Sequence, residues 1–144
     1  MNQVEIEFEN VTPTKDQINI LFELLLERSH RISYEENNFN EHETFVKSHP
    51  YRSWFLIKIS DNYVGSFYVS KENTIGINIA DNYVRLAVAP IINFVESNFE
   101  PLSAIPSVRN GKFAVNVSPA NKLLAKALEE IGANIAQITY FLPS

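Results

Sequence analysis

The chain of 144 residues is the size of one domain, and its 45% hydrophobic and 12% aromatic residues suffice for a folded core. A formal net charge of −5 provides no basic field for nucleic-acid phosphates or anionic lipid, and the absence of cysteine excludes disulfides, thiolate catalysis and Cys-containing zinc sites. No apolar run approaches the ~18 residues of a membrane span, and no signal-peptide pattern is present. We therefore expect a single cytoplasmic domain over residues 1–144 that binds neither nucleic acid nor membrane.

The first half of the chain predicts one strand followed by two helices. Residues Val4 to Phe8 alternate apolar and acidic side chains with the period of a half-buried strand. Thr14 and Gln17 form a capping-box signature that opens a helix running to about Arg28. Asn40 is expected to cap a second, shorter helix.

A meander of three strands is predicted next. The runs 54–59 and 63–69 are rich in aromatic and β-branched residues and are joined by Ser60-Asp61-Asn62, residue types that tolerate tight turns. A second turn, residues 71–73, leads into a strand over 74–79, in which three isoleucines share one face.

The second half predicts helix, strand, helix and strand. An apolar helix is expected over 85–99, with Pro90 tolerable only near its first turn, and a strand over 113–117. Ser118 as N-cap with Pro119 at the first helical position predicts a helix that ends at Gly132. A final strand is expected over 135–142.

Several stretches match a known pattern. Residues 121–132 read NKLLAKALEEIG, which keeps Asn121, Glu129 and Gly132 at the spacing of a motif that follows a strand. The middle segment HPYRSWFLIKISDNYVGSFYVSKENTIGINI and the ending IAQITYFL add to this match. In these residues and in the order of its elements, the chain resembles the GNAT superfamily of acyl-CoA-dependent N-acetyltransferases. The resemblance implies an α+β fold with a mixed, mostly antiparallel central sheet of about six strands flanked by about four helices.

The resemblance also implies a site for acetyl-CoA as cosubstrate. In the family the pantetheine arm lies between the fourth and fifth strands, which places it against Ile77, Asn78 and Ile79. The following loop cradles the pyrophosphate at a helix N-terminus. The matching residues here are Val84, Arg85, Leu86, Ala87, Val88 and Ala89. Ala87 replaces a glycine that permits close backbone approach, Pro90 lacks an N–H, and the Arg85 side chain can compensate. Asn121 matches a family Asn that approaches the pantetheine, although it can also serve as a helix cap.

The catalytic positions of the family are partly replaced. Leu128 stands where many members have a tyrosine that protonates the departing thiolate, and Thr74 stands where the subgroup has a glutamate base. Glu72 can act through water or be solvated surface. Tyr68 can line an acceptor pocket or serve only in packing, and Asn116 can hydrogen-bond cofactor or acceptor or be a plain strand-end amide.

Two functions remain open. The first is transfer of an acetyl or other acyl group from acetyl-CoA to a primary amine of a small molecule, by direct attack in a ternary complex. The second is a non-catalytic module that binds acyl-CoA or a partner. His30, His42 and His49 lie in separate segments without ligand spacing, so no metal is expected. The resemblance leaves a homodimer open.

Overall fold

A computed structural model describes residues 4–27 and 38–143. The elements follow in the order β1 (Ile6–Asn10), α1 (Lys15–Glu27), α2 (Phe39–Ser48), β2 (Ser53–Ile59), β3 (Asn62–Val69), β4 (Thr74–Ile79), the 3-10 helix η1 (Asp81–Tyr83), α3 (Val84–Asn98), β5 (Ala114–Val115) and α4 (Lys122–Glu130). Within these described ranges, five strands form one sheet in the order β1-β2-β3-β4-β5, antiparallel except for the parallel β4–β5 pair. The predicted α+β class and mostly antiparallel sheet are confirmed, with five strands in place of about six.

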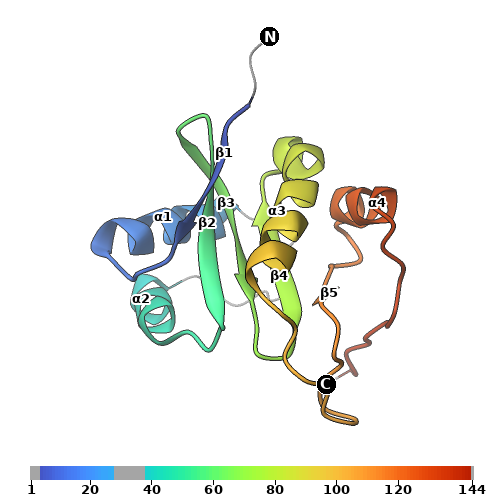
Figure 1. Ribbon diagram of the computed structural model, residues 1–144. Helices are drawn as coiled ribbons and strands as arrows, with labels where there is room; N and C mark the ends of the chain where they lie inside the picture. The colour runs from blue at the N-terminus through green and yellow to red at the C-terminus, as the bar shows by residue number, and fades with distance from the viewer. Residues whose placement is uncertain (1–3, 28–37, 144) are drawn as a thin grey trace.

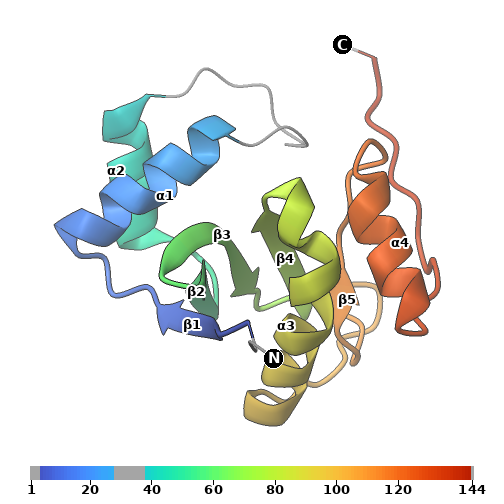
Figure 2. The ribbon, with the colours of Figure 1, turned by 90° about the horizontal axis from the view of Figure 1, so that it is seen from above.

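The sheet separates two helical layers (Figures 1 and 2). Helices α1 and α2 cover one face, and α3 with α4 covers the other. Successive side chains of a strand point to opposite faces, so Trp54 and Leu56 of β2 pack toward α1 and α2, while Phe55 and Ile57 pack toward α3. This is why β2 is apolar at nearly every position.

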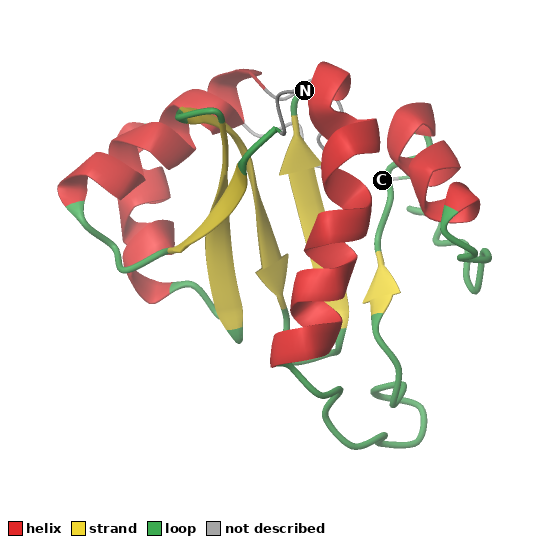
Figure 3. Ribbon diagram, turned by 45° about the horizontal axis from the view of Figure 1, so that its top comes forward, coloured by secondary structure: helices red, strands yellow, loops and turns green. Residues whose placement is uncertain are grey.

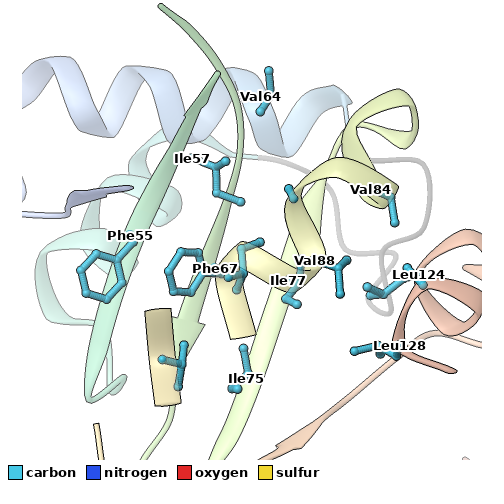
Figure 4. Close-up of a cluster of buried hydrophobic side chains, with 14 of the residues drawn as sticks. Phe55, Ile57, Val64, Phe67, Ile75, Ile77, Val84, Val88, Leu124 and Leu128 are labelled. Atoms are coloured by element: carbon cyan, nitrogen blue, oxygen red, sulfur yellow. The ribbon is translucent and has the colours of Figure 1, made fainter. Parts of the chain in front are cut away.

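The larger core lies between the sheet and α3 and α4. Figure 4 shows Phe67 and Ile77 from the strands together with Val88 of α3 and Leu124 of α4. Phe67, Val88 and Leu124 are at most 2% exposed. This packing fixes the positions of both C-terminal helices relative to β4.

A polar cluster joins β1 to α1. The predicted cap is present, because the Gln17 N–H donates to Thr14 Oγ1 at 3.2 Å. The buried Gln17 side chain accepts from the Thr12 N–H at 2.7 Å and donates to the Asn10 carbonyl and to Glu9 Oε2, both at 2.9 Å. Tyr63 donates to the other carboxylate oxygen of Glu9 at 2.8 Å. The first connection is therefore held by side chains as well as by backbone.

Three predictions about the later elements are wrong. Pro90 is the seventh residue of α3, beyond its first turn. Helix α4 is capped by Asn121 and not by Ser118, because the Asn121 side chain accepts the Leu124 N–H at 3.2 Å. Residues 135–142 form no strand; they make no pairing with any described strand. None of the helices in the described ranges is both long and apolar enough to cross a bilayer.

Candidate functional site

The parallel pair of β4 and β5 opens after two residue pairs. Thr74 pairs with Ala114 and Ile75 with Val115, and beyond them the two strands have no further pairing. Figure 3 shows β5 as a short arrow beside α3, which lies in front of β4. The divergence leaves one edge of residues 76–79 without a neighbouring strand in the described part of the chain.

The hydrogen bonds around β4 show which backbone groups face this open edge. The Asn73 carbonyl accepts from the Ala114 N–H on the β5 side, and the Thr74 carbonyl accepts from the Ser70 N–H on the β3 side. Alternate residues of a strand present their N–H and C=O to the same edge. Ile77 and Ile79 therefore direct their backbone groups toward the gap beside β5.

A cavity of about 410 Å³ occupies this gap and continues toward α1 and α2. The predicted cofactor residues Ile77, Asn78 and Ile79 line it on the β4 side. Asn116, Ser118 and Asn121 line it on the opposite side. The structure thus brings the β4 residues, Asn116 and Asn121 around one cavity. The Asn121 amide oxygen also caps α4, by accepting the Leu124 N–H.

Tyr68 forms part of the cavity wall and lies flat against Tyr51. Their rings are stacked with centroids 3.8 Å apart and planes 9° apart. Tyr68 pairs with Gly76 of β4, and a methyl group added to Gly76 would overlap the Tyr68 ring. The missing side chain at Gly76 therefore allows this ring to lie across β4.

Acidic and aromatic side chains also line the cavity. Glu27 and Asp81 line it, as do Phe45 and Trp54, whose rings are 5.9 Å apart. Of the described lining residues, none is lysine or arginine. A cavity wall that carries carboxylates and aromatic faces and no described lysine or arginine favours a cation.

His42 also lines the cavity, from α2. Its Nε2 lies 3.0 Å from the Ile18 carbonyl oxygen, which can only accept, so Nε2 carries a proton and donates. In the neutral ring Nδ1 is then the acceptor. His49, in the adjacent aromatic cluster, accepts the Tyr51 N–H at 3.2 Å, and burial lowers its pKa. His30 lies outside the described residues.

The six residues matched to the phosphate loop form the first turns of α3 and do not line the cavity. Val84, Ala87 and Val88 are at most 1% exposed and belong to the core. The Arg85 side chain is 77% exposed and lies 3.9 Å from Glu130. The first N–H of α3, that of Val84, already donates to the Asp81 carbonyl of η1. The groups that remain for an anion here are the later N–H groups of the first turn of α3 and the Arg85 side chain.

Glu72 is not brought to the cavity. It lies exposed in the β3–β4 turn, while the cavity is lined at the other end of the hairpin by Gly65 and Ala80. Thr74 hydrogen-bonds Ser70 at 2.6 Å between side-chain oxygens, and Leu128 is 8% exposed in the core. Neither supplies an acid or base to the cavity.

Asn73 holds the segment that leads into β5. It is fully buried, its side chain donates to the carbonyls of Leu102 and Asn110 at 2.8 Å each, and it accepts the Leu102 N–H at 2.8 Å. The sequence shows Asn73 only as a turn residue. The sequence analysis also missed three cavity residues, His42, Glu27 and Asp81. A position on one face of a helix, or just after a strand, is equally typical of surface and core residues, so the sequence alone gives no signal that these side chains reach a cavity.

Comparisons with known proteins place this geometry in a fold. No protein-family model and no curated protein matches the sequence. Among solved structures, the aminoglycoside N-acetyltransferase AAC(6')-Iy in complex with CoA is 10% identical, with a TM-score of 0.63 and coverage of 99% of this chain and 97% of that one. A ribosomal-protein-alanine N-acetyltransferase from Brucella melitensis is also 10% identical, with a TM-score of 0.63 and coverage of 99% and 100%. A domain from Methanocaldococcus jannaschii is 17% identical, with a TM-score of 0.62 and coverage of 90% and 88%. The chain therefore has the fold of the GNAT acetyltransferases.

Proposed function

We propose that the protein transfers an acyl group, most simply acetyl, from acetyl-CoA to a primary amine of a small molecule. The observation that carries this is the opened β4–β5 pair, whose exposed backbone edge lies along a 410 Å³ cavity that acidic and aromatic side chains also line. An extended arm can add to that edge as another strand would. AAC(6')-Iy, which shares the fold, is known in complex with CoA and with a bisubstrate analogue of CoA and acetylneamine, and this supports the proposal.

The backbone of β4 provides the central interactions. The N–H and C=O groups of Ile77 and Ile79 hold the amides of the pantetheine arm, and one N–H donates to the thioester oxygen as it gains negative charge. Asn116 and Asn121 hold the arm from the other side. The N-terminus of α3 and Arg85 attract the pyrophosphate.

The acceptor is a cationic small molecule. Its protonated amines are drawn to the Glu27 and Asp81 carboxylates and to the aromatic faces of Phe45 and Trp54. One amine loses a proton and attacks the thioester carbonyl, so that a C–N bond forms and the C–S bond breaks. His42 Nδ1 takes the proton from the attacking nitrogen, directly or through a water, and the Tyr68 hydroxyl donates one to the departing thiolate.

Thiol release tests this function directly. The chain contains no cysteine, so every thiol that appears with acetyl-CoA and an amine comes from CoA. We expect thiol release above background with di- and polyamines or amino sugars, and less with neutral or anionic amines. Silence across a broad panel of amines and acyl donors would contradict catalysis.

Tyr68→Phe tests the proton donor, because it keeps the ring stack and removes the hydroxyl. We expect kcat to fall roughly 10- to 100-fold with little change in KM. Tyr63→Phe, whose hydroxyl bonds Glu9 at β1, is the matched control and should leave kcat unchanged. An unaffected kcat in Tyr68→Phe would show that water protonates the thiolate.

A second function is favoured by the buried Leu128, which leaves the family's proton-donor position without an acid. In this view the protein binds acyl-CoA without turnover. Calorimetry separates the two functions, since tight acetyl-CoA binding with no thiol release would support the second.

A further inference from the structure

Two polar side chains lie next to each other on the sheet surface that the cavity covers. Ser66 of β3 and Asn78 of β4 are directly opposed in the sheet, and both line the cavity. Ser66 is also opposed to Leu56, whose side chain packs toward α1 and α2. Directly opposed residues share a face of the sheet, so the Ser66 and Asn78 side chains lie on the α1 and α2 side.

The protein itself provides no hydrogen-bond partner for this pair. Ser66 is only 6% exposed. No hydrogen bond joins its hydroxyl, or the Asn78 side-chain amide, to another described residue. Among the described residues, no buried side-chain nitrogen or oxygen is both sealed from solvent and without a partner, so the Ser66 oxygen opens onto the cavity. Buried hydroxyl groups are normally hydrogen-bonded, and the partner here must come from whatever fills the cavity.

The surroundings of the pair are aromatic and apolar. At the neighbouring position of the same two strands, the Tyr68 ring lies across Gly76 and covers the sheet. Leu21, Leu24 and Leu25 of α1 line the cavity on the helical side, and their side chains neither donate nor accept. On β3 and β4, a ligand that lies on this face beyond the Tyr68 ring therefore meets the Ser66 hydroxyl and the Asn78 amide.

We propose that Ser66 and Asn78 determine the specificity of the enzyme by binding a hydroxyl group of the acceptor. The preferred acceptors are then amines that carry a hydroxyl close to the reacting nitrogen. This inference rests on the proposed acyl transfer, in which the acyl donor lies along the backbone edge of Ile77 and Ile79. Asn78 lies between those two residues, so a group bound to its side chain is near the thioester.

The chemistry of the pair favours a hydroxyl over other groups. Both side chains are neutral, and each can donate and accept. A carboxylate on the acceptor would find no lysine or arginine among the described lining residues, and it would meet the carboxylates of Glu27 and Asp81. The Cβ atoms of opposed residues are about 5 Å apart, so one oxygen atom between them can donate to one side chain and accept from the other.

A matched pair of acceptors tests the proposal. Diaminopropane and diaminopropanol differ only by a hydroxyl on the middle carbon. We expect the wild-type enzyme to acetylate diaminopropanol with a kcat/KM about tenfold higher or more, because the shorter analogue leaves a site built for a hydroxyl without its partner. The hydroxyl also changes the basicity of the amines, but this effect is the same for every variant and cancels when the ratios of kcat/KM are compared.

Ser66→Ala and Asn78→Leu remove the two polar groups and keep the approximate size of each side chain. Each should lower kcat/KM for diaminopropanol about tenfold and leave kcat/KM for diaminopropane nearly unchanged. A merely structural effect would instead lower both. Ser70→Ala is the matched control, because Ser70 is equally buried and is bonded to Thr74 at 2.6 Å, but it does not line the cavity. It should leave the ratio of the two acceptors unchanged, even though it lowers stability.

The outcomes separate this inference from the proposed function. Equal kcat/KM for the two acceptors in the wild type, or a preference that Ser66→Ala and Asn78→Leu both retain, would overturn the inference and leave acyl transfer in place. If neither acceptor releases thiol, calorimetric titration of both amines into the CoA complex still decides. Tighter binding of diaminopropanol that Ser66→Ala abolishes would support the pair as a hydroxyl site, whereas equal binding or none would refute it.

Discussion

At the scale of single residues, Gly76 determines where the Tyr68 ring lies. Gly76→Ala places a methyl group inside the volume of that ring, so the ring must leave its stack on Tyr51. We expect a loss of about 1–3 kcal/mol in the free energy of unfolding, larger than the gain from stiffening the unfolded chain. Urea denaturation of Gly76→Ala, Tyr68→Ala and the double variant measures it. If the two losses add, the ring and the glycine do not interact.

Glu9 gives the fold a dependence on pH. Hydrogen bonds from Gln17 and then from Tyr63 lower the pKa of the Glu9 carboxyl, with a smaller contribution from the charge of Lys58, although partial burial opposes them. A group whose pKa is lower in the folded state contributes stability above its unfolded pKa and loses it as pH falls. Acidification below about 4.5, the ordinary Glu pKa, should therefore lower the free energy of unfolding.

Tyr63→Phe removes one of those two hydrogen bonds and should reduce this acid-induced loss. The measurement is the urea midpoint from pH 6 to pH 3 (roughly the range over which a carboxyl titrates) for wild type and variant. Equal slopes in both would show that the Tyr63 hydroxyl does not stabilise the carboxylate. The same hydrogen bond raises the pKa of Tyr63, so its contribution is also lost as pH rises through the folded tyrosine pKa.

At the scale of elements, substitutions at the start of α3 separate the stability of the core from the affinity for CoA. Ala87 is fully buried in the core, so Ala87→Gly should lower the stability by about 1–2 kcal/mol without improving CoA affinity. Arg85 is exposed, so Arg85→Ala should hardly change stability but should weaken CoA binding about fivefold. Calorimetric titration with CoA checks both, and Glu130→Gln, which frees Arg85, should not weaken binding. Unchanged CoA affinity in Arg85→Ala would show that the Arg85 side chain does not contribute to CoA binding.

The elements that the sequence predicted well are those with local causes. Strands β2, β3 and β4 follow from uninterrupted aromatic and β-branched runs, and the turn between β2 and β3 from Ser60 and Asp61, both with positive φ. The predictions that were wrong depend on distant contacts. Whether residues 135–142 form a strand depends on an available partner edge, and whether Ser118 or Asn121 caps α4 depends on how the chain leaves β5.

The residues named from the sequence that line the cavity lie on or next to strands: residues 77–79 of β4, Tyr68 of β3, and Asn116 and Asn121 after β5. Ile77 to Ile79 follow from the order of elements and the resemblance. Residues 84–89 were matched to a phosphate-binding loop at the start of the predicted helix. The apolar period of Val84, Ala87 and Val88 instead turns these side chains into the core. Side chains such as Glu27 and His42, which reach the cavity from α1 and α2, give no signal in the sequence because nothing local distinguishes them.

At the scale of the whole molecule, the structure predicts uneven stability. Strands β2 and β3 are paired along both edges, whereas β5 is joined to the sheet by two residue pairs. Amides of β5 and α4 should therefore exchange with solvent faster than those of β2 and β3. Hydrogen-exchange mass spectrometry with and without CoA should also show that CoA slows exchange at β5 and at residues 77–79. Uniform exchange, unaffected by CoA, would contradict the location of the site.

The open edge of β4 has a consequence for how this chain can vary. A site made of the N–H and C=O groups of Ile77 and Ile79 requires an extended backbone and asks of the side chains only that they pack in the core, so apolar substitutions there can accumulate without loss of binding. Such a site can persist while the sequence around it drifts beyond what family models detect. Proline is the exception, because it is the one residue without a backbone N–H. Replacement of a single backbone amide of β4 by an ester, which also removes an N–H, is therefore the chemical change that should weaken binding most.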